Sequence, residues 1–258
     1  MSSLAERLRL LLSKKARRAR RQQLENALPP DAARIFTGQQ VLHGVFEGMK
    51  YPFLQSVGSM LYPKLLGSYE REIHPQIERF CQNDYSEIID VGCAEGYYAV
   101  GLALKLPNAK VYAYDTEEVA RQLCTDMARI NGVADRVEVR GFLTAQELGA
   151  FPVTRRGLVI CDCEGFELEL FNEQNLQHLR HCDLLVETHD FMNIEISTKL
   201  LALFSRTHNV STIKSIDDIE KAKTYDFPET RGLDLATKKK VFRELRPAIM
   251  EWLVCTPK

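Results

Sequence analysis

The stretch that most constrains the fold is residues 88–98, an apolar run that ends in an acid and a loop of small residues. The run has the length of a strand and stops at Asp-x-Gly-x-Ala-x-Gly, after which apolar residues recur at helical spacing. Gly92 and Gly96 permit backbone torsions and close approach that a side chain forbids. The stretch predicts a strand, a tight loop and a helix whose N-terminus faces a nucleotide-type ligand.

The spacing of the small residues argues against a dinucleotide, whose fingerprint is Gly-x-Gly-x-x-Gly. Here the small residues stand at 92, 94 and 96, and Tyr97 takes the place of the third glycine. The loop resembles motif I of class I S-adenosylmethionine-dependent methyltransferases, where the acid and the loop backbone hold the cofactor. That resemblance implies S-adenosyl-L-methionine as cofactor, with contacts from Asp90, Gly92, Cys93, Ala94, Glu95, Gly96 and Tyr97.

A second acid supports the same cofactor. Residues 110–114 form a strand pattern that ends at Asp115, 25 residues beyond Asp90. A carboxylate there can accept hydrogen bonds from both ribose hydroxyls. A short strand at 137–139 precedes a Gly-Phe pair that lies where such folds grip adenine, with a simple turn as the alternative. The further cofactor contacts expected are Asp115, Thr116, Gly141, Phe142 and Asp162.

The rest of the chain alternates strands and helices. Strand patterns recur at 158–161, 183–186, 208–211 and 250–255, and helical patterns lie between them, including one over 167–179. The resemblance implies an α/β Rossmann-like sheet of seven strands, the last antiparallel, with helices on both faces and an N-terminal helical extension. The domains expected are a basic amphipathic helix at 1–28, a helical or lid segment at 29–86, and the methyltransferase domain at 87–258 with an insertion at 215–247.

The N-terminus carries most of the charge asymmetry. The 258 residues have a net charge of −1, yet residues 1–21 contain eight Lys or Arg against one acid, with leucines on one helical face. Such a helix can pack on the domain or on a second copy in a homo-oligomer, or contact an anionic membrane surface. Nucleic acid is disfavoured as a partner, because the aromatic residues that stack on bases are missing there.

Cysteine usage and hydropathy favour a cytoplasmic protein. Seven cysteines at irregular spacing, without a Cys-x-x-Cys pair, form neither a disulfide framework nor a zinc site. No apolar run reaches the 18 residues of a membrane span, and the leucines at 10–12 are too few for a signal peptide.

Three motifs narrow the resemblance. Asp-x-Glu-Gly-x-Glu at 162–167, Glu-Thr-His-Asp at 187–190 and Glu-Trp-Leu at 251–253 resemble the FkbM family of S-adenosylmethionine-dependent methyltransferases. That family mostly methylates oxygens of sugars, polyketides and related secondary metabolites. The resemblance runs from Asp90 to the C-terminus, with Ala94 in place of the usual glycine. It implies O-methylation of a small hydroxylated metabolite; the alternatives are an RNA or protein methyltransferase that uses the basic helix, and a non-catalytic cofactor-binding subunit.

The acids that follow the fourth and fifth strands are the expected chemical centre, because ligands bind outside the carboxyl ends of parallel strands. A hydroxyl acceptor needs a base, and His189 and Glu164 are the candidates. Asp162, Glu187 and His189 also form a candidate Mg²⁺ site. The alternative is that these carboxylates balance the sulfonium charge and hold the substrate.

Overall fold

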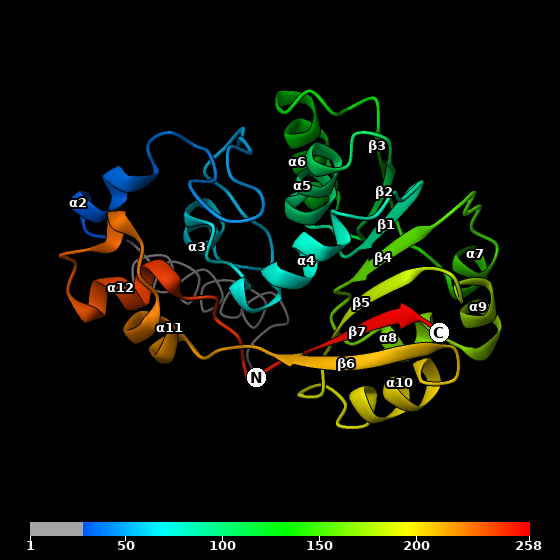
Figure 1. The fold of residues 1–258 in the computed structure, drawn as a ribbon. Coiled ribbons are helices and arrows are strands. Elements are labelled where there is room, and N and C mark those ends of the chain that lie inside the picture. Colours follow the sequence, from blue (N-terminus) through cyan, green and yellow to red (C-terminus); the bar gives the residue numbers. More distant parts are fainter. Residues whose placement is uncertain (1–27) are drawn as a thin grey trace, which may run out of the picture.

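The computed structural model describes residues 28–258, so the predicted basic helix lies outside the described residues except for its last position. The sheet that the described residues form is shown in Figure 1. Its seven strands are β1 Glu87–Val91, β2 Lys110–Tyr114, β3 Val137–Arg140, β4 Gly157–Cys161, β5 Asp183–Thr188, β6 His208–Lys214 and β7 Glu251–Pro257.

The strand order is β3-β2-β1-β4-β5-β7-β6. Strands β1 to β5 are parallel to one another, whereas β7 is antiparallel to both β5 and β6. This arrangement confirms the predicted seven-stranded Rossmann-like sheet with an antiparallel last strand. The order reverses between β1 and β4, so the residues after these two strands meet at the ligand-binding edge.

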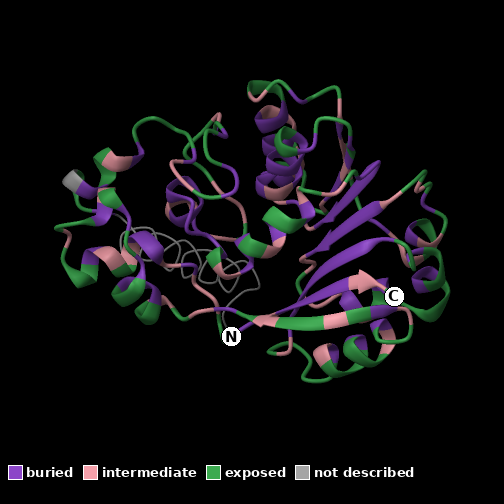
Figure 2. Ribbon diagram, in the orientation of Figure 1, coloured by how far each residue is buried: buried purple, intermediate pink, exposed green. Residues whose placement is uncertain are grey.

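Helices cover both faces of the sheet. Strand β4 shows why its sequence is apolar throughout: Leu158 and Ile160 join the core on one face, and Val159 and Cys161 join the core on the other. Figure 2 shows the central strands buried along their length. One face is covered by α4 His74–Phe80, α5 Tyr97–Lys105 and α6 Glu118–Ile130, and the other by α7 Ala145–Gly149, α8 Glu167–Leu170, α9 Glu173–His178 and α10 Ile196–Phe204.

Two segments far apart in the sequence form a cap beside the sheet, which we define as residues 29–73 and 215–247. Figure 1 shows them side by side, in blue and orange. His43 Nε2 lies 2.9 Å from a carboxylate oxygen of Glu229, and the Arg71 guanidinium lies 5.1 Å from the rings of Tyr225 and Phe227. The cap contains α2 Pro30–Ala33, η1 Arg34–Phe36, α3 Leu61–Leu66, η2 Arg71–Ile73, α11 Asp218–Thr224, η3 Pro228–Thr230 and α12 Leu235–Phe242.

Two sequence expectations are corrected. The single helix expected over 167–179 is split into α8 and α9, because Phe171 is extended and the Asn172 side chain caps α9 by accepting a 2.9 Å hydrogen bond from the Asn175 N–H. The sixth strand continues to Lys214, three residues beyond the expected end, because it pairs with β7 along its whole length.

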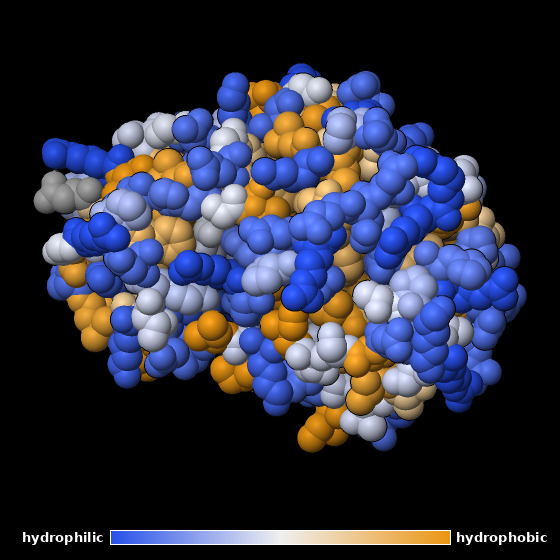
Figure 3. All heavy atoms as spheres, viewed as in Figure 1, coloured by the Kyte–Doolittle hydropathy of each residue, from blue (hydrophilic) through white to orange (hydrophobic). Residues whose placement is uncertain are grey.

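The surface of the described part is mainly polar on the face drawn in Figure 3, where hydrophobic residues emerge in separate small patches. No helix within residues 28–258 is both long and apolar enough to cross a membrane.

Gly92 provides a test of the loop geometry. Its φ is +84°, and a Cβ there would lie 1.7 Å from the backbone oxygen of Asp162. We expect Gly92→Ala to lower the free energy of unfolding by at least about 3 kcal/mol, because backbone must move. Gly132, at φ +70° with no atom near its Cβ position, is the matched control and should lose only about 1 kcal/mol as Gly132→Ala. Equal losses of unfolding free energy in the two variants, measured by denaturant titration, would contradict the close approach of Gly92 to the Asp162 backbone.

Candidate active site

A cavity of about 470 Å³ opens at the carboxyl ends of β1, β2, β4 and β5. It is lined by every predicted site residue except Glu95 and Gly96. The cap supplies lining residues that the sequence did not indicate. The predicted residues that line it are Asp90, Gly92, Cys93, Ala94, Tyr97, Asp115, Thr116, Gly141, Phe142, Asp162, Glu164, Glu187 and His189, and the additional ones include Val57, Gly58, Ser59, Phe166, Phe191, Glu244, Leu245, Arg246 and Pro247.

The loop after β1 turns sharply toward β2. Gly92, Ala94 and Gly96 have φ values of +84°, +47° and +97°. The N–H groups of Gly92 and Cys93 both donate to the carbonyl of Tyr114, at 2.8 and 3.0 Å. The left-handed conformation of Ala94 costs about 1 kcal/mol, because its Cβ crowds the backbone. A glycine at this position would have no such cost.

Asp115 joins the loop to the end of β2. Its Oδ2 accepts a 2.8 Å hydrogen bond from the Ala94 N–H, and its Oδ1 accepts one of 2.8 Å from the Glu117 N–H. A carboxylate oxygen has two lone pairs, so each oxygen retains a site for a further donor from the cavity.

Glu95 differs from its expected role, because it faces the cap rather than the cavity. Lys64 Nζ lies 2.6 Å from Glu95 Oε1, with 3% and 2% of the two side chains exposed. Ser56 and the Val57 N–H also donate to this carboxylate, at 2.9 and 3.1 Å. Gly96 is needed for packing, since a Cβ there would lie 2.8 Å from Cys124 Sγ. Glu95 thus anchors the cap segment that covers the loop.

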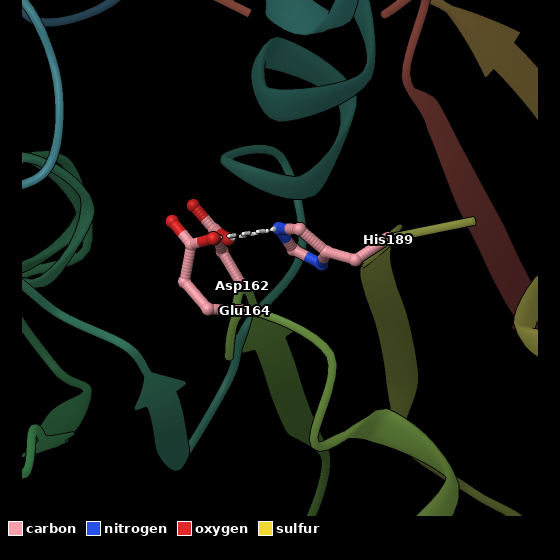
Figure 4. Close-up of side chains that lie close together, drawn as sticks. All are labelled: Asp162, Glu164 and His189. Carbon is pink, nitrogen blue, oxygen red and sulfur yellow. Dashed lines mark ion pairs between the residues drawn. The ribbon is translucent and has the colours of Figure 1, made fainter. Parts of the chain in front are cut away.

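Asp162, Glu164 and His189 converge where β4 and β5 end, at the same edge of the sheet as the loop (Figure 4). His189 Nε2 lies 3.3 Å from Asp162 Oδ1 and 3.6 Å from Glu164 Oε2. On its other side, His189 Nδ1 is 2.6 Å from Oε1 of Glu167, which is fully buried. The sequence analysis did not assign Glu167 to the site, although it closes the same Asp-x-Glu-Gly-x-Glu motif.

The carboxylates around His189 determine its pKa. Burial by itself lowers the pKa of His189, but Asp162 and Glu167 outweigh it and raise that pKa to about 11. The raised pKa favours the protonated imidazole, and the role of His189 as general base stays a prediction. Although 71% of the Glu164 side chain is exposed, its partial burial and the neighbouring Asp162 charge raise the pKa of its carboxyl. Glu164 is the better proton acceptor of the two.

Arg246 forms the wall between this group and the cap. Its guanidinium pairs with Glu70 and Glu187, and its Nε lies 2.9 Å from Glu244 Oε2. Glu70 is completely buried and also accepts a hydrogen bond from Tyr98. Burial raises the pKa of Glu70 to about 7 and that of Glu187 well above its usual range, even though Arg246 lowers both.

Asp90 offers an unpaired carboxylate oxygen to a bound ligand. The side chain is 2% exposed, and its Oδ2 has no hydrogen-bond partner among the described residues. Burial, and then the charge of Asp162, raises the pKa of Asp90 to about 7. Because the residue lines the cavity, a cationic donor bound there would satisfy the unpaired oxygen.

Comparisons with known proteins agree with the fold. Residues 75–163 match the family model of ribosomal protein L11 methyltransferase (PrmA). This segment contains β1 to β4, the loop and Asp115, but not the cap. None of the curated proteins matches the sequence.

Solved structures similar to this chain are distant in sequence. Precorrin-6y C5,15-methyltransferase from Geobacter metallireducens GS-15 is 10% identical, with a TM-score of 0.49 over 75% of this chain and 90% of that one. The O-methyltransferase TomG from Streptomyces achromogenes is 14% identical, with a TM-score of 0.47 over 74% and 81%. An rRNA methylase from Streptococcus thermophilus is 14% identical, with a TM-score of 0.46 over 73% and 98%. The strand order and the family match assign the chain the fold of class I S-adenosylmethionine-dependent methyltransferases, a fold of enzymes.

Asp90→Asn tests the unpaired carboxylate. Because burial raises the folded-state pKa of Asp90 to about 7, above the value of about 3.9 in an unfolded chain, stability falls as the pH rises from about 4 through 7. The variant lacks this loss and should exceed wild type by about 2–4 kcal/mol in free energy of unfolding at pH 8, and by much less at pH 5. Asp135→Asn, at an exposed position, is the control. A variant no more stable than wild type at pH 8 would show that Asp90 is not destabilised by burial.

Proposed function

We propose that the protein transfers the methyl group of S-adenosyl-L-methionine to an oxygen of a small hydroxylated metabolite, such as a sugar or a secondary metabolite, as the resemblance to the FkbM family implies. The observation that carries this proposal is that one cavity joins the loop after β1 to the cluster of Asp162, Glu164 and His189. Donor and acceptor can then meet inside a single enclosed space.

The residues at the loop end fit the cofactor. The unpaired Oδ2 of Asp90 suits the amino group, and the free lone pairs of Asp115 suit the ribose hydroxyls. Phe142 is 53% exposed and packs edge-on against Phe166, which leaves a ring face for the adenine. When bound, the cofactor supplies a methyl group on a positively charged sulfur.

The acidic end of the cavity suits the acceptor. As the acceptor oxygen forms its bond to the methyl carbon, the carbon–sulfur bond breaks and S-adenosylhomocysteine leaves. The hydroxyl proton passes to Glu164, whose raised pKa favours that transfer. His189, fixed by Glu167, lies beside Asp162 and Glu164 and keeps both carboxylates next to the reacting atoms.

A protein acceptor is the second candidate, because the matching family model is that of an enzyme named for a ribosomal protein. The match ends at Cys163 and so leaves out Glu164, His189 and the second cap segment. On this alternative, the Lys and Arg residues within 1–21 would hold a large acceptor.

Cofactor binding gives the first test. Calorimetry should show one S-adenosylhomocysteine bound per chain, and Asp115→Ala should weaken it at least tenfold, because two charge-assisted hydrogen bonds to the ribose are lost. Asp115→Asn retains one acceptor oxygen, so its affinity for S-adenosylhomocysteine should lie between those of the wild type and Asp115→Ala. Asp135→Ala, at an exposed position, is the control and should bind like wild type. Absence of binding to the wild-type chain would overturn the proposed function.

Acceptor class gives the second test. The chain is incubated with methyl-labelled cofactor and with separate small-metabolite, protein and RNA fractions. Label should enter the small-metabolite fraction, and Glu164→Gln should lower kcat by about 10²-fold or more, since it removes the proton acceptor. Label confined to the protein fraction would support the second candidate, and label confined to the RNA fraction would contradict both candidates.

A further inference from the structure

The cluster of Asp162, Glu164 and His189 has the composition of a metal site. Asp162, Glu164 and His189 each offer one ligand atom, and these atoms all lie within 4.8 Å of one another. Figure 4 shows the two carboxylates from the segment after β4 meeting the imidazole from the segment after β5. A cation about 2.1 Å from each atom requires only a small contraction of this arrangement.

His189 is oriented as a ligand, and a metal ion would displace the proton from its Nε2. The 2.6 Å contact between its Nδ1 and Glu167 Oε1 fixes the ring, so that Nε2 points into the cluster. Both side chains are buried, with 3% of His189 and none of Glu167 exposed. A carboxylate behind the imidazole is the usual partner of a metal-binding histidine, since it sets the tautomer and strengthens the ligand.

An unsatisfied oxygen lies at the same place. Asp162 Oδ1 is shielded from solvent and accepts no hydrogen bond from the described residues. His189 Nε2 approaches it to 3.3 Å, and Glu187 Oε2 lies 4.0 Å from the same nitrogen. Several carboxylate oxygens around one point repel each other unless a cation lies between them.

We propose that Asp162, Glu164 and His189 bind one divalent transition-metal ion such as Mn²⁺. The imidazole ligand favours a first-row transition metal over Mg²⁺, which prefers oxygen ligands alone. Glu164 replaces Glu187 in the set expected from sequence, because Glu187 is held by Arg246. Glu167 orients His189 and does not itself touch the metal.

This inference rests on the proposed function and extends it to the acceptor class. Three protein ligands leave open positions on an octahedral ion, and two neighbouring oxygens of one acceptor can fill them. The matching acceptor is a vicinal diol or an α-hydroxy acid. Its bound hydroxyl becomes more acidic, and its proton can pass to the Glu164 oxygen that does not bind the metal.

Metal binding is measured directly on the full chain after treatment with a chelator and dialysis. Mn²⁺ is titrated while the electron paramagnetic resonance signal of the free ion is followed, and we expect one ion per chain. Asp162→Asn and Glu164→Gln should each weaken binding at least tenfold, and Glu167→Gln by about 10 to 100-fold. Glu169→Gln changes an exposed acid on the same helix as Glu167 and should leave binding unchanged.

Two results would overturn the site: no saturable binding of Mn²⁺ or Zn²⁺, or binding that is unchanged in both Asp162→Asn and Glu164→Gln. Because Glu164 is 71% exposed, its variant should fold normally, which a denaturant titration checks. S-adenosylhomocysteine is titrated into the same metal-free preparation. Cofactor binding without metal binding overturns only the metal site, whereas metal binding without cofactor binding overturns only the proposed function.

Discussion

The buried guanidinium of Arg246 is the interaction on which the arrangement of the site depends. It faces Glu70 from the first cap segment, Glu187 from β5 and Glu244 from the second cap segment, while only 13% of the arginine is exposed. Three carboxylates this close and this buried would repel one another without a cation between them. One arginine therefore joins both parts of the cap to the sheet and forms a wall of the cavity.

The cofactor half of the molecule could be predicted because its signals are local. The strand at 88–91, the small residues of the loop and the acid at the end of β2 lie within a few residues of the atoms they position. Glycine spacing and the alternation of strand and helix report such contacts directly. The contact of Glu95 with the cap could not be predicted, because nothing in its sequence neighbourhood reveals that Lys64 approaches.

The cap half could not be predicted because its contacts join distant residues. Glu70 and Arg246 are 176 positions apart, and no local period links them. In the structure Glu70 is a completely buried partner of Arg246. Glu167 lies outside the cap and was missed for another reason. Its place in the motif at 162–167 was visible in the sequence, but its contact with His189 was not.

The division of the cap between two distant segments affects the order of assembly during synthesis. At about 5 to 20 residues per second, the ribosome needs on the order of ten seconds or more to proceed from the first cap segment to the second. Lys64 can reach Glu95 early, because only 31 positions separate them. Glu70, by contrast, has no arginine to face until residue 246 has emerged, and a carboxylate without its counter-ion stays hydrated. The nascent chain can therefore complete its nucleotide pocket well before it can enclose an acceptor.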